Sequence, residues 1–338
     1  MKLVITGAAG FIGSRFAELA ADHAERLGYR EIVLLDALTY SGRRENMDTV
    51  LRDSRVTFVH GSINDAELVD TVLVGAHAVV HLAAESHVDR SIHGAQPFFV
   101  SNVLGTQQLL ESSRRAGVEK FVHVSTDEVY GSISEGSWPE THILAPNSPY
   151  SASKAGSDLA ALAYHATFGL HVSVTRCSNN YGPRQFPEKV IPLFVSNLID
   201  GKKVPLYGDG LNVRDWLHVD DHCQGLLLVL ENGGPGQIYN IGGGTELTNR
   251  ELTSRLLALC GVGEEMIEPV ADRLGHDRRY SVDCTKISRE LGYSPQVPFA
   301  MGLEATVKWY YDNELWWRPR SEEHTSELQS HHDLVCRL

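Results

Sequence analysis

Hydrophobic residues in the first half of the chain occur in short runs that alternate with longer segments of mixed character. The runs cover residues 3–6, 31–36, 56–60, 78–82, 120–125 and 171–176. Apolar positions within a run are nearly continuous, which is typical of strands covered on both faces. Helix-length segments between such runs indicate repeated strand–helix units. The pattern predicts an α/β fold built on a doubly wound parallel sheet.

The pattern becomes less regular after about residue 178, where proline and glycine interrupt it repeatedly. We therefore expect residues 1–178 to form the domain with the main sheet. Residues 179–319 are expected to form mainly a smaller α/β domain, interleaved with the first. Since no low-complexity linker separates the two parts, they are predicted to pack around a shared cleft.

Composition narrows the classes of function. The chain has 338 residues, 42% of them hydrophobic, and a formal net charge of −13, which argues against a broad basic surface for nucleic acid or an anionic membrane. No apolar run approaches the roughly 20 residues that span a bilayer, and the chain begins directly with a strand pattern, so we expect a cytoplasmic location. The five cysteines are widely spaced, which predicts reduced thiols and neither a disulfide framework nor a metal site.

The last stretch, residues 320–338, is polar and has no apolar periodicity. Residues 320–330 (Arg-Ser-Glu-Glu-His-Thr-Ser-Glu-Leu-Gln-Ser) resemble the translation of a common sequencing adapter. We interpret this tail as an artefact and exclude it from the expected fold. A natural disordered tail is the alternative.

Three glycines, Gly7, Gly10 and Gly13, follow the first predicted strand and precede a segment with helical spacing. Such glycines tighten the turn and let the backbone approach a pyrophosphate, while the N-terminus of the helix offers N–H groups. The first domain is therefore predicted to be a Rossmann-type dinucleotide-binding domain. Asp36 ends the second strand, where a carboxylate binds ribose hydroxyls and repels a 2′-phosphate, which favours NAD over NADP.

Candidate catalytic residues lie farther along. Tyr150 and Lys154 share one face of a predicted helix. An ammonium group near the tyrosine hydroxyl, together with the positive nicotinamide, favours phenolate and makes the tyrosine a usable base. Thr126, Asp127 and Glu128 follow a predicted strand. Adjacent carboxylates raise one another's proton affinity, so one can serve as an acid and the other as a base.

The chain resembles the extended short-chain dehydrogenase family over about residues 3–319. The likeness rests on the glycine motif, on Tyr150-x-x-x-Lys154 and on residues 214–221 (Arg-Asp-Trp-Leu-His-Val-Asp-Asp). Four blocks are similar to the dTDP-glucose 4,6-dehydratase family: 83–91 (Ala-Ala-Glu-Ser-His-Val-Asp-Arg-Ser), 125–131 (Ser-Thr-Asp-Glu-Val-Tyr-Gly), 179–183 (Asn-Asn-Tyr-Gly-Pro) and 186–189 (Phe-Pro-Glu-Lys).

The resemblance implies an NAD-dependent hydro-lyase that converts dTDP-glucose to dTDP-4-keto-6-deoxyglucose and water. It implies that Tyr150 takes the C4 hydroxyl proton, Glu128 removes the C5 proton and Asp127 protonates the departing C6 hydroxyl, supported by Thr126 and Lys154. It also implies a homodimer that pairs through two helices of each subunit, here about residues 98–116 and 153–168.

The implied binding residues form two sets. Those for the cofactor are Gly7, Gly10, Phe11, Ile12, Gly13, Asp36, Leu38, Thr39, Ile63, Asp65, Leu82, Ala83, Ala84, Tyr150, Lys154 and Asn180. Those for the sugar nucleotide are Ser86, Thr126, Asn179, Glu188, Lys189, Val190, Pro205, Leu206, Tyr207, Arg214, Asn249, Asp272, Arg273 and His276. Leu274 departs from the proline that the family often has in this last segment. No metal is expected.

Other activities stay open at this point. A UDP-glucose 4,6-dehydratase would share the same apparatus and differ by one methyl group, which discriminates by only about 1–3 kcal/mol. A sugar-nucleotide 4-epimerase or decarboxylase is less favoured, since the adjacent carboxylates would be surplus to an epimerase. A non-catalytic NAD sensor on the same fold is the alternative from a different class. His81, His123, His218 and His222 lie in or beside apolar runs, so we interpret them as structural.

Overall fold

A parallel sheet of seven strands forms the centre of the computed structural model, which describes residues 1–272 and 274–319. In spatial order the strands are β10 (Gln237–Ile241), β6 (Val172–Cys177), β5 (Lys120–Thr126), β4 (Ala78–His81), β1 (Lys2–Thr6), β2 (Glu31–Asp36) and β3 (Val56–His60). The six strands expected from the hydrophobic runs are all present. The prediction of an α/β fold with a doubly wound parallel sheet is confirmed.

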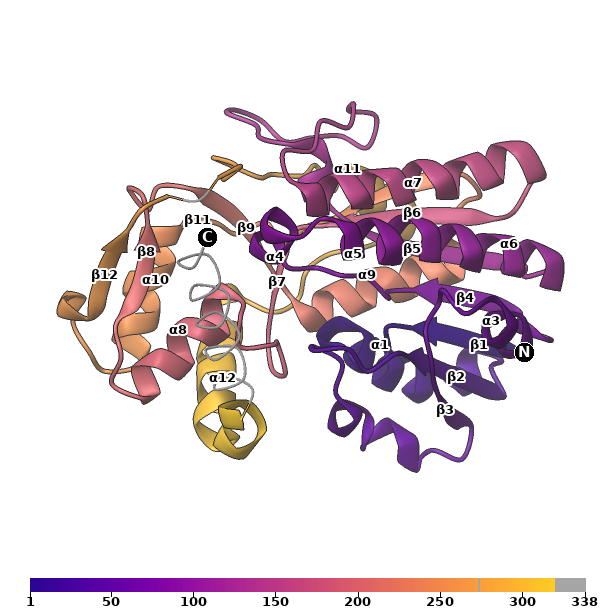
Figure 1. Cartoon of the computed structure of the whole chain (residues 1–338), viewed down its shortest axis with the longest axis horizontal. Coiled ribbons are helices and arrows are strands. Elements are labelled where there is room, and N and C mark those ends of the chain that lie inside the picture. Colours follow the sequence, from indigo (N-terminus) through magenta and orange to yellow (C-terminus); the bar gives the residue numbers. More distant parts are fainter. Residues whose placement is uncertain (273, 320–338) are drawn as a thin grey trace, which may run out of the picture.

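Helices cover both faces of this sheet, as Figure 1 shows for α6 (Thr106–Ala116) and α7 (Pro149–Phe168) on one side. One face packs against α1 (Phe11–Asp22), α2 (Ala24–Leu27), α9 (Val219–Asn232) and α11 (Thr285–Leu291), and the other against α3 (Ala66–Leu73), α6 and α7. Successive side chains of a strand point to opposite faces. Leu3 and Ile5 therefore enter one core and Val4 the other, which explains why the run is continuously apolar.

A smaller lobe lies beside the sheet (Figure 1). It contains a sheet of β11 (Glu246–Thr248), β9 (Val213–His218) and β7 (Asn179–Tyr181), and a pair formed by β12 (Ile267–Val270) and β8 (Val204–Tyr207). Its helices are α8 (Val190–Ile199), α10 (Asn249–Leu259) and α12 (Phe299–Asp312). Their apolar faces meet in one core that includes Trp216, Leu252 and Leu303.

Short elements connect the larger ones. They are α4 (Val88–His93), α5 (Gln96–Phe98), the π-helix η3 (Phe99–Gly105) and the 3₁₀ turns η1 (Arg44–Met47), η2 (Val50–Arg52), η4 (Asp127–Tyr130) and η5 (Glu264–Met266). The π-helix continues directly into α6.

The chain passes from the large lobe to the small lobe and then returns to the large lobe. Strand β10 pairs in parallel with β6, beginning with Gln237 opposite Ser173, and α9 packs against α1. Residues 219–241 therefore pack with the large sheet, α9 against one face and β10 as an edge strand, although they follow residue 178. The division at residue 178 stays a prediction, and we propose that residues 219–241 be counted with the first domain.

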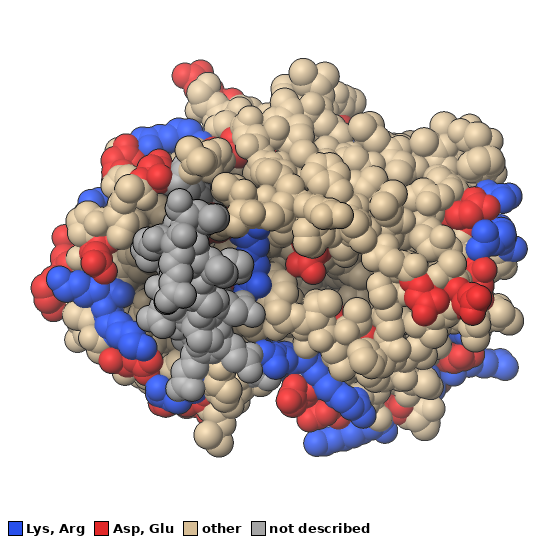
Figure 2. All heavy atoms as spheres, viewed as in Figure 1, with Lys and Arg blue, Asp and Glu red and all other residues tan. Residues whose placement is uncertain are grey.

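Charged side chains of both signs are intermixed on the face shown in Figure 2, and both signs are visible in the hollow between the lobes. Among the described residues, no helix combines the length and the apolar character needed to cross a bilayer. The interpretation of residues 320–338 as an artefact concerns positions outside the described residues.

Candidate active site

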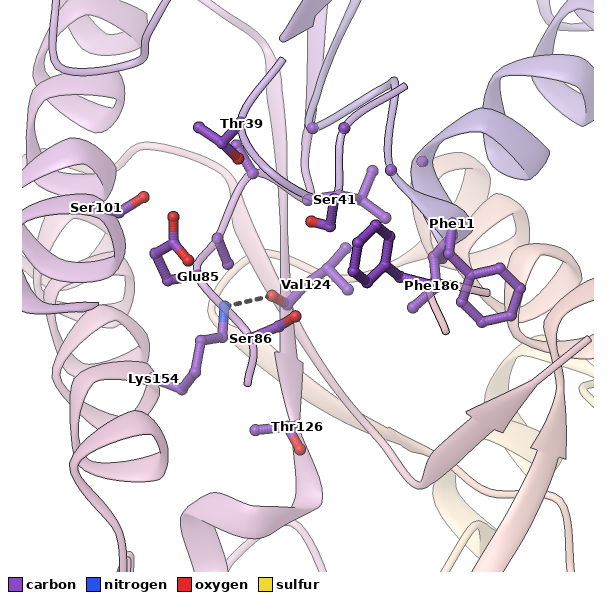
Figure 3. Close-up of a pocket in the computed structure, with 18 of the residues that line it drawn as sticks. Phe11, Thr39, Ser41, Glu85, Ser86, Ser101, Val124, Thr126, Lys154 and Phe186 are labelled. Atoms are coloured by element: carbon purple, nitrogen blue, oxygen red, sulfur yellow. Dashed lines mark hydrogen bonds between the residues drawn. The ribbon is translucent and has the colours of Figure 1, made fainter. Parts of the chain in front are cut away.

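A cavity of about 440 Å³ lies at the carboxyl ends of β1, β2, β4 and β5, where doubly wound sheets place their ligands. Its volume is within the usual range for small-molecule sites. It brings together these residues from the predicted sets: Gly7, Gly10, Phe11, Ile12, Gly13, Asp36, Thr39, Ile63, Leu82, Ala83, Ala84, Ser86, Thr126, Asp127, Glu128, Tyr150, Lys154, Asn179, Asn180, Glu188 and Lys189. Figure 3 shows part of this lining.

The glycine turn between β1 and α1 leaves no room for side chains. Gly7 has a φ of +70°, and a Cβ there would lie 2.5 Å from the backbone nitrogen of Ala83. A Cβ on Gly13 would lie 2.0 Å from the carbonyl oxygen of Gly7. Gly10 is the N-cap of α1, and no side chain caps the helix there. The first N–H groups of α1 thus face a cradle that fits the diphosphate of a dinucleotide.

Asp36 lies at the end of β2 with its carboxylate buried against the same turn. One oxygen accepts a hydrogen bond of 2.9 Å from the Ala9 amide, and the other accepts one of 2.8 Å from the Leu38 amide. Burial raises the pKa of Asp36, and these two hydrogen bonds oppose that shift. Since a carboxylate oxygen has two lone pairs, each oxygen can still accept from a ribose hydroxyl.

Helix α7 presents Tyr150 and Lys154 to the cavity. Its start is fixed by Pro149 in the first turn and by a capping box between Ser148 and Ser151. The ammonium group of Lys154 donates a hydrogen bond of 2.7 Å to the carbonyl oxygen of Val124 on β5, drawn dashed in Figure 3. Burial lowers the pKa of Lys154 to about 8.

Tyr150 is almost fully buried. Burial raises its pKa well above 10, the nearby Glu128 raises it further, and a hydrogen bond with Thr126 opposes the rise. The chain alone therefore disfavours phenolate, contrary to the expected effect of Lys154. The other part of that expectation was the positive charge of a bound nicotinamide, which acts in the required direction.

The acidic pair follows directly from β5. Thr126 ends the strand and caps η4, since its hydroxyl accepts a hydrogen bond of 3.3 Å from the Glu128 amide. The Asp127 side chain is buried, with the residue only 1% exposed, and its Oδ2 has no hydrogen-bond partner within the described chain. Burial raises the pKa of Asp127 well above its usual value, and the charge of Glu128 adds to this. A carboxyl group that stays protonated near neutral pH suits a proton donor.

The four histidines interpreted as structural are buried and have hydrogen-bond partners. His81 lies between the hydroxyls of Thr6 and Thr106, each 2.8 Å from a ring nitrogen. His123 contacts Ser157 and Asp158 on α7. His218 caps α9, and His222 contacts Asn180.

Several predicted residues lie outside the lining of the cavity. They are Leu38, Asp65, Val190, Pro205, Leu206, Tyr207, Arg214, Asn249, Asp272 and His276, whereas Arg273 lies outside the described residues. Asp65 caps α3 by accepting a hydrogen bond from the Leu68 amide.

The remaining polar members of that group gather in the small lobe. His276 lies 2.6 Å from an Asp272 oxygen and packs edge-on against the Tyr207 ring. The Arg214 guanidinium lies 4.2 Å from the centre of the Tyr280 ring and donates a hydrogen bond of 2.9 Å to the carbonyl oxygen of Asp277.

The lining also includes residues that the sequence analysis did not assign, among them Glu85, Ser101, Phe186 and Ser178. Glu85 follows the Ala83-Ala84 pair at the end of β4, so its position in the chain was a usable signal. Ser101 comes from the π-helix η3, and no local pattern marks that segment as part of the site. Within residues 1–272 and 274–319, no cluster of three or more His, Cys, Asp or Glu side chains is suited to hold a metal ion.

Comparison with known proteins places this geometry in a family. The sequence model of the GDP-mannose 4,6-dehydratase family matches residues 4–306. A dTDP-glucose 4,6-dehydratase of Streptomyces antibioticus is 61% identical over 321 residues, covering 94% of this chain and 95% of that protein.

Solved structures agree with the sequence comparison. The dTDP-glucose 4,6-dehydratase DesIV of Streptomyces venezuelae, determined with NAD and dTDP bound, has a TM-score of 0.93 and 59% identity, covering 95% of this chain and all of that one. A UDP-glucose 4-epimerase of Thermotoga maritima, determined with UDP-glucose, has a TM-score of 0.83 and 33% identity, covering 92% and 99%. The chain therefore belongs to the dTDP-glucose 4,6-dehydratases, within the family of sugar-nucleotide dehydratases and epimerases of the short-chain dehydrogenase type.

Proposed function

We propose that this chain converts dTDP-glucose to dTDP-4-keto-6-deoxyglucose and water, with NAD as its cofactor. The observation that carries the proposal is that Tyr150, Asp127 and Glu128 line the same cavity as the glycine turn. A dinucleotide held by that turn and by Asp36 would extend along the cavity toward Tyr150 and Lys154. When bound, NAD accepts a hydride from C4 of the sugar and later returns a hydride to C6.

The protein residues handle the protons. Tyr150 takes the proton of the C4 hydroxyl as C4 is oxidised to a ketone. The ketone acidifies the C5 hydrogen, which Glu128 removes as a proton while Asp127 donates its proton to the C6 hydroxyl, which leaves as water. The raised pKa of buried Asp127 keeps it protonated for this step. Glu128 then returns its proton to C5 as C6 is reduced. Tyr150 releases the proton it took and Asp127 takes one up, so the enzyme returns to its starting protonation state.

We propose that the nucleotide is held by the small lobe. Arg214 has a planar guanidinium that can form paired hydrogen bonds with a diphosphate. In the same lobe, Tyr207 ends β8, Asn249 begins α10, and Asp272 and His276 follow β12. These contacts, like the individual catalytic roles, are proposals that mutation can test.

The decisive experiment is incubation of the protein with dTDP-glucose and, separately, with UDP-glucose, reading the alkaline absorbance of the 4-keto-6-deoxy product. Product from dTDP-glucose alone is expected. Product only from UDP-glucose would overturn the choice of nucleobase. If neither yields product while NAD is bound, the dehydratase proposal fails, and testing for epimerised or decarboxylated sugar becomes the next step.

A homodimer is part of the proposal. The outer side of the π-helix η3 and of α7 exposes large apolar side chains, with Leu104 58% and Leu159 59% exposed. A second copy covering these helices would remove that surface from water. Light scattering after size-exclusion chromatography should give twice the chain mass, and the monomer mass at micromolar concentration would contradict it. We also propose a cytoplasmic location, since the four described cysteines are free thiols, in keeping with a reducing compartment.

A further inference from the structure

A strap formed by residues 37–43 crosses the edge of the cavity between β2 and η1. Both of its ends are fixed to the cofactor side. The amide of Leu38 donates a 2.8 Å hydrogen bond to Asp36, and the amide of Arg43 donates one of 2.9 Å to the carbonyl oxygen of Ala9 in the glycine turn. Between these anchors, the strap contributes Thr39, Ser41 and Gly42 to the lining. Figure 3 shows Thr39 and Ser41.

The middle of the strap contacts the opposite side of the cavity. The hydroxyl of Tyr40 donates a 2.9 Å hydrogen bond to Oε1 of Glu188, which lies 148 residues later in the chain. The Tyr40 ring meets that of Phe186 edge-on, with the ring centres 5.5 Å apart. The side chain of Glu188 is only 1% exposed, so this carboxylate depends on its protein partners.

Arg90 of α4 completes the junction. Its Nε donates a 3.2 Å hydrogen bond to the other oxygen of Glu188, and its guanidinium lies 4.0 Å from the centre of the Tyr40 ring. A second tie joins the same two segments, because the ammonium group of Lys189 donates a 2.7 Å hydrogen bond to the carbonyl oxygen of Ser86. Three segments thus converge on one buried carboxylate beside the cavity.

We infer that Tyr40, Arg90 and Glu188 form a latch that holds the strap closed over bound NAD and slows its release. The inference rests on the proposed function, because it requires a dinucleotide in the cavity. The proposed reaction makes slow release useful. Oxidation at C4 and reduction at C6 use the same cofactor, so loss of the reduced form between these steps would leave the sugar unfinished.

The geometry explains why opening the strap is unfavourable. Lifting Tyr40 removes the hydrogen bond to Oε1 of Glu188 and the ring beneath Arg90, while Glu188 stays buried. A buried charge that loses a partner costs free energy, so the open form is rarely populated. The release rate of NAD falls with that population. Tyr40 and Arg90 each engage one oxygen of Glu188. The predicted contact of Glu188 with substrate stays a prediction.

The test compares NAD release from the full-length protein and from Tyr40→Phe. This change removes the hydroxyl and keeps the ring that packs against Phe186 and Arg90. Protein loaded with labelled NAD is diluted into excess unlabelled NAD, and the label still bound is measured over time. We expect roughly tenfold faster release from the variant, as for loss of one hydrogen bond to a charged group. Tyr239→Phe is the matched control, since it removes a hydroxyl that accepts from the Gly234 amide away from the cavity, and it should release NAD at the parent rate.

A double-mutant cycle identifies the contact. Glu188→Gln alone should also speed NAD release. The double variant should release NAD much more slowly than the product of the two single effects predicts, because both changes act on the same Tyr40–Glu188 contact. If the double variant shows the full product of the two single fold-changes in release rate, the latch is contradicted. Equal release rates for the parent and Tyr40→Phe would also contradict it. If NAD binds normally and only these rates disagree, the latch fails and the proposed function stands. If the parent binds no NAD, both fail.

Discussion

The proposed cofactor half and the proposed nucleotide half of the site are built in different ways. The glycine turn and Asp36 lie at the edge of one parallel sheet, and the Tyr150–Lys154 pair lies on a helix packed against that sheet; all of them line one cavity. Tyr207, Arg214 and Asn249 come from two small sheets and the start of a helix, and they lie outside that lining. The first half is fixed by a rigid sheet, whereas the second depends on how a separate lobe is placed. Substitutions should therefore separate chemistry from nucleotide binding.

The largest expected effect is in the cofactor half. Tyr150→Phe should reduce kcat for dTDP-glucose by about a thousandfold, because the general base for C4 oxidation is lost. NAD binding should persist, since the glycine turn and Asp36 are untouched. Steady-state rates of product formation measure the loss, with Tyr239→Phe as a control. A variant that keeps most of the parent kcat would remove Tyr150 from its proposed role.

Burial of Lys154 in the same half can be tested through the pH dependence of folding stability. Burial lowers its pKa from 10.5 to about 8, so the folded chain disfavours the charged lysine. Between pH 8 and 10.5 the unfolded chain binds this proton and the folded chain does not. The stability of the parent relative to Lys154→Met should therefore rise over this range, by roughly 3 kcal/mol at about 1.4 kcal/mol per pKa unit.

This shift can be measured as the free energy of urea unfolding without NAD, at neutral and at alkaline pH. Lys202→Met, which removes the ammonium group of a side chain that is 64% exposed in the small lobe, is the control. A parent-minus-variant difference that does not change with pH would show that burial of Lys154 imposes no such cost.

Changing Glu128 of the acidic pair should separate oxidation at C4 from the later elimination of water. Glu128→Gln should lower product formation by about a hundredfold, because an amide cannot remove the C5 proton. Oxidation at C4 does not need this base, so absorbance of reduced nicotinamide should accumulate after dTDP-glucose is added. Glu67→Gln, on α3, is the control. Loss of turnover without any such accumulation would place Glu128 in the oxidation step instead.

The smallest effect is expected in the nucleotide half. Arg214→Lys keeps the charge and loses the planar pair of donors, so KM for dTDP-glucose should rise about tenfold with little change in NAD binding. Arg278→Lys, at an exposed ion pair with Asp209, is the control. If Arg214→Lys weakens NAD binding as much as substrate binding, the two halves are not independent, and the comparison fails.

Local sequence was sufficient to predict the strand ends, the glycine turn and the Tyr150–Lys154 pair that line the cavity. The runs at 3–6, 31–36 and 120–125 lie in strands because continuous β-branched and aliphatic residues suit burial on both faces. Gly7 and Gly13 are required by short-range geometry, since any Cβ there meets nearby backbone. Tyr150 and Lys154 share a face because the helical repeat places them there.

Tertiary structure decided what depends on segments far apart in the chain. Packing between such segments returns β10 to the main sheet and buries Asp127, which raises its pKa. It also forms the contact between Tyr40 and Glu188. The sequence determined the fold class and the chemical groups, because those follow from short-range periodicity and residue type. Only the folded chain determined which side chains are buried, how burial shifts their pKa values, and how the strap at residues 37–43 is held closed. These properties depend on which distant groups exclude water from each other.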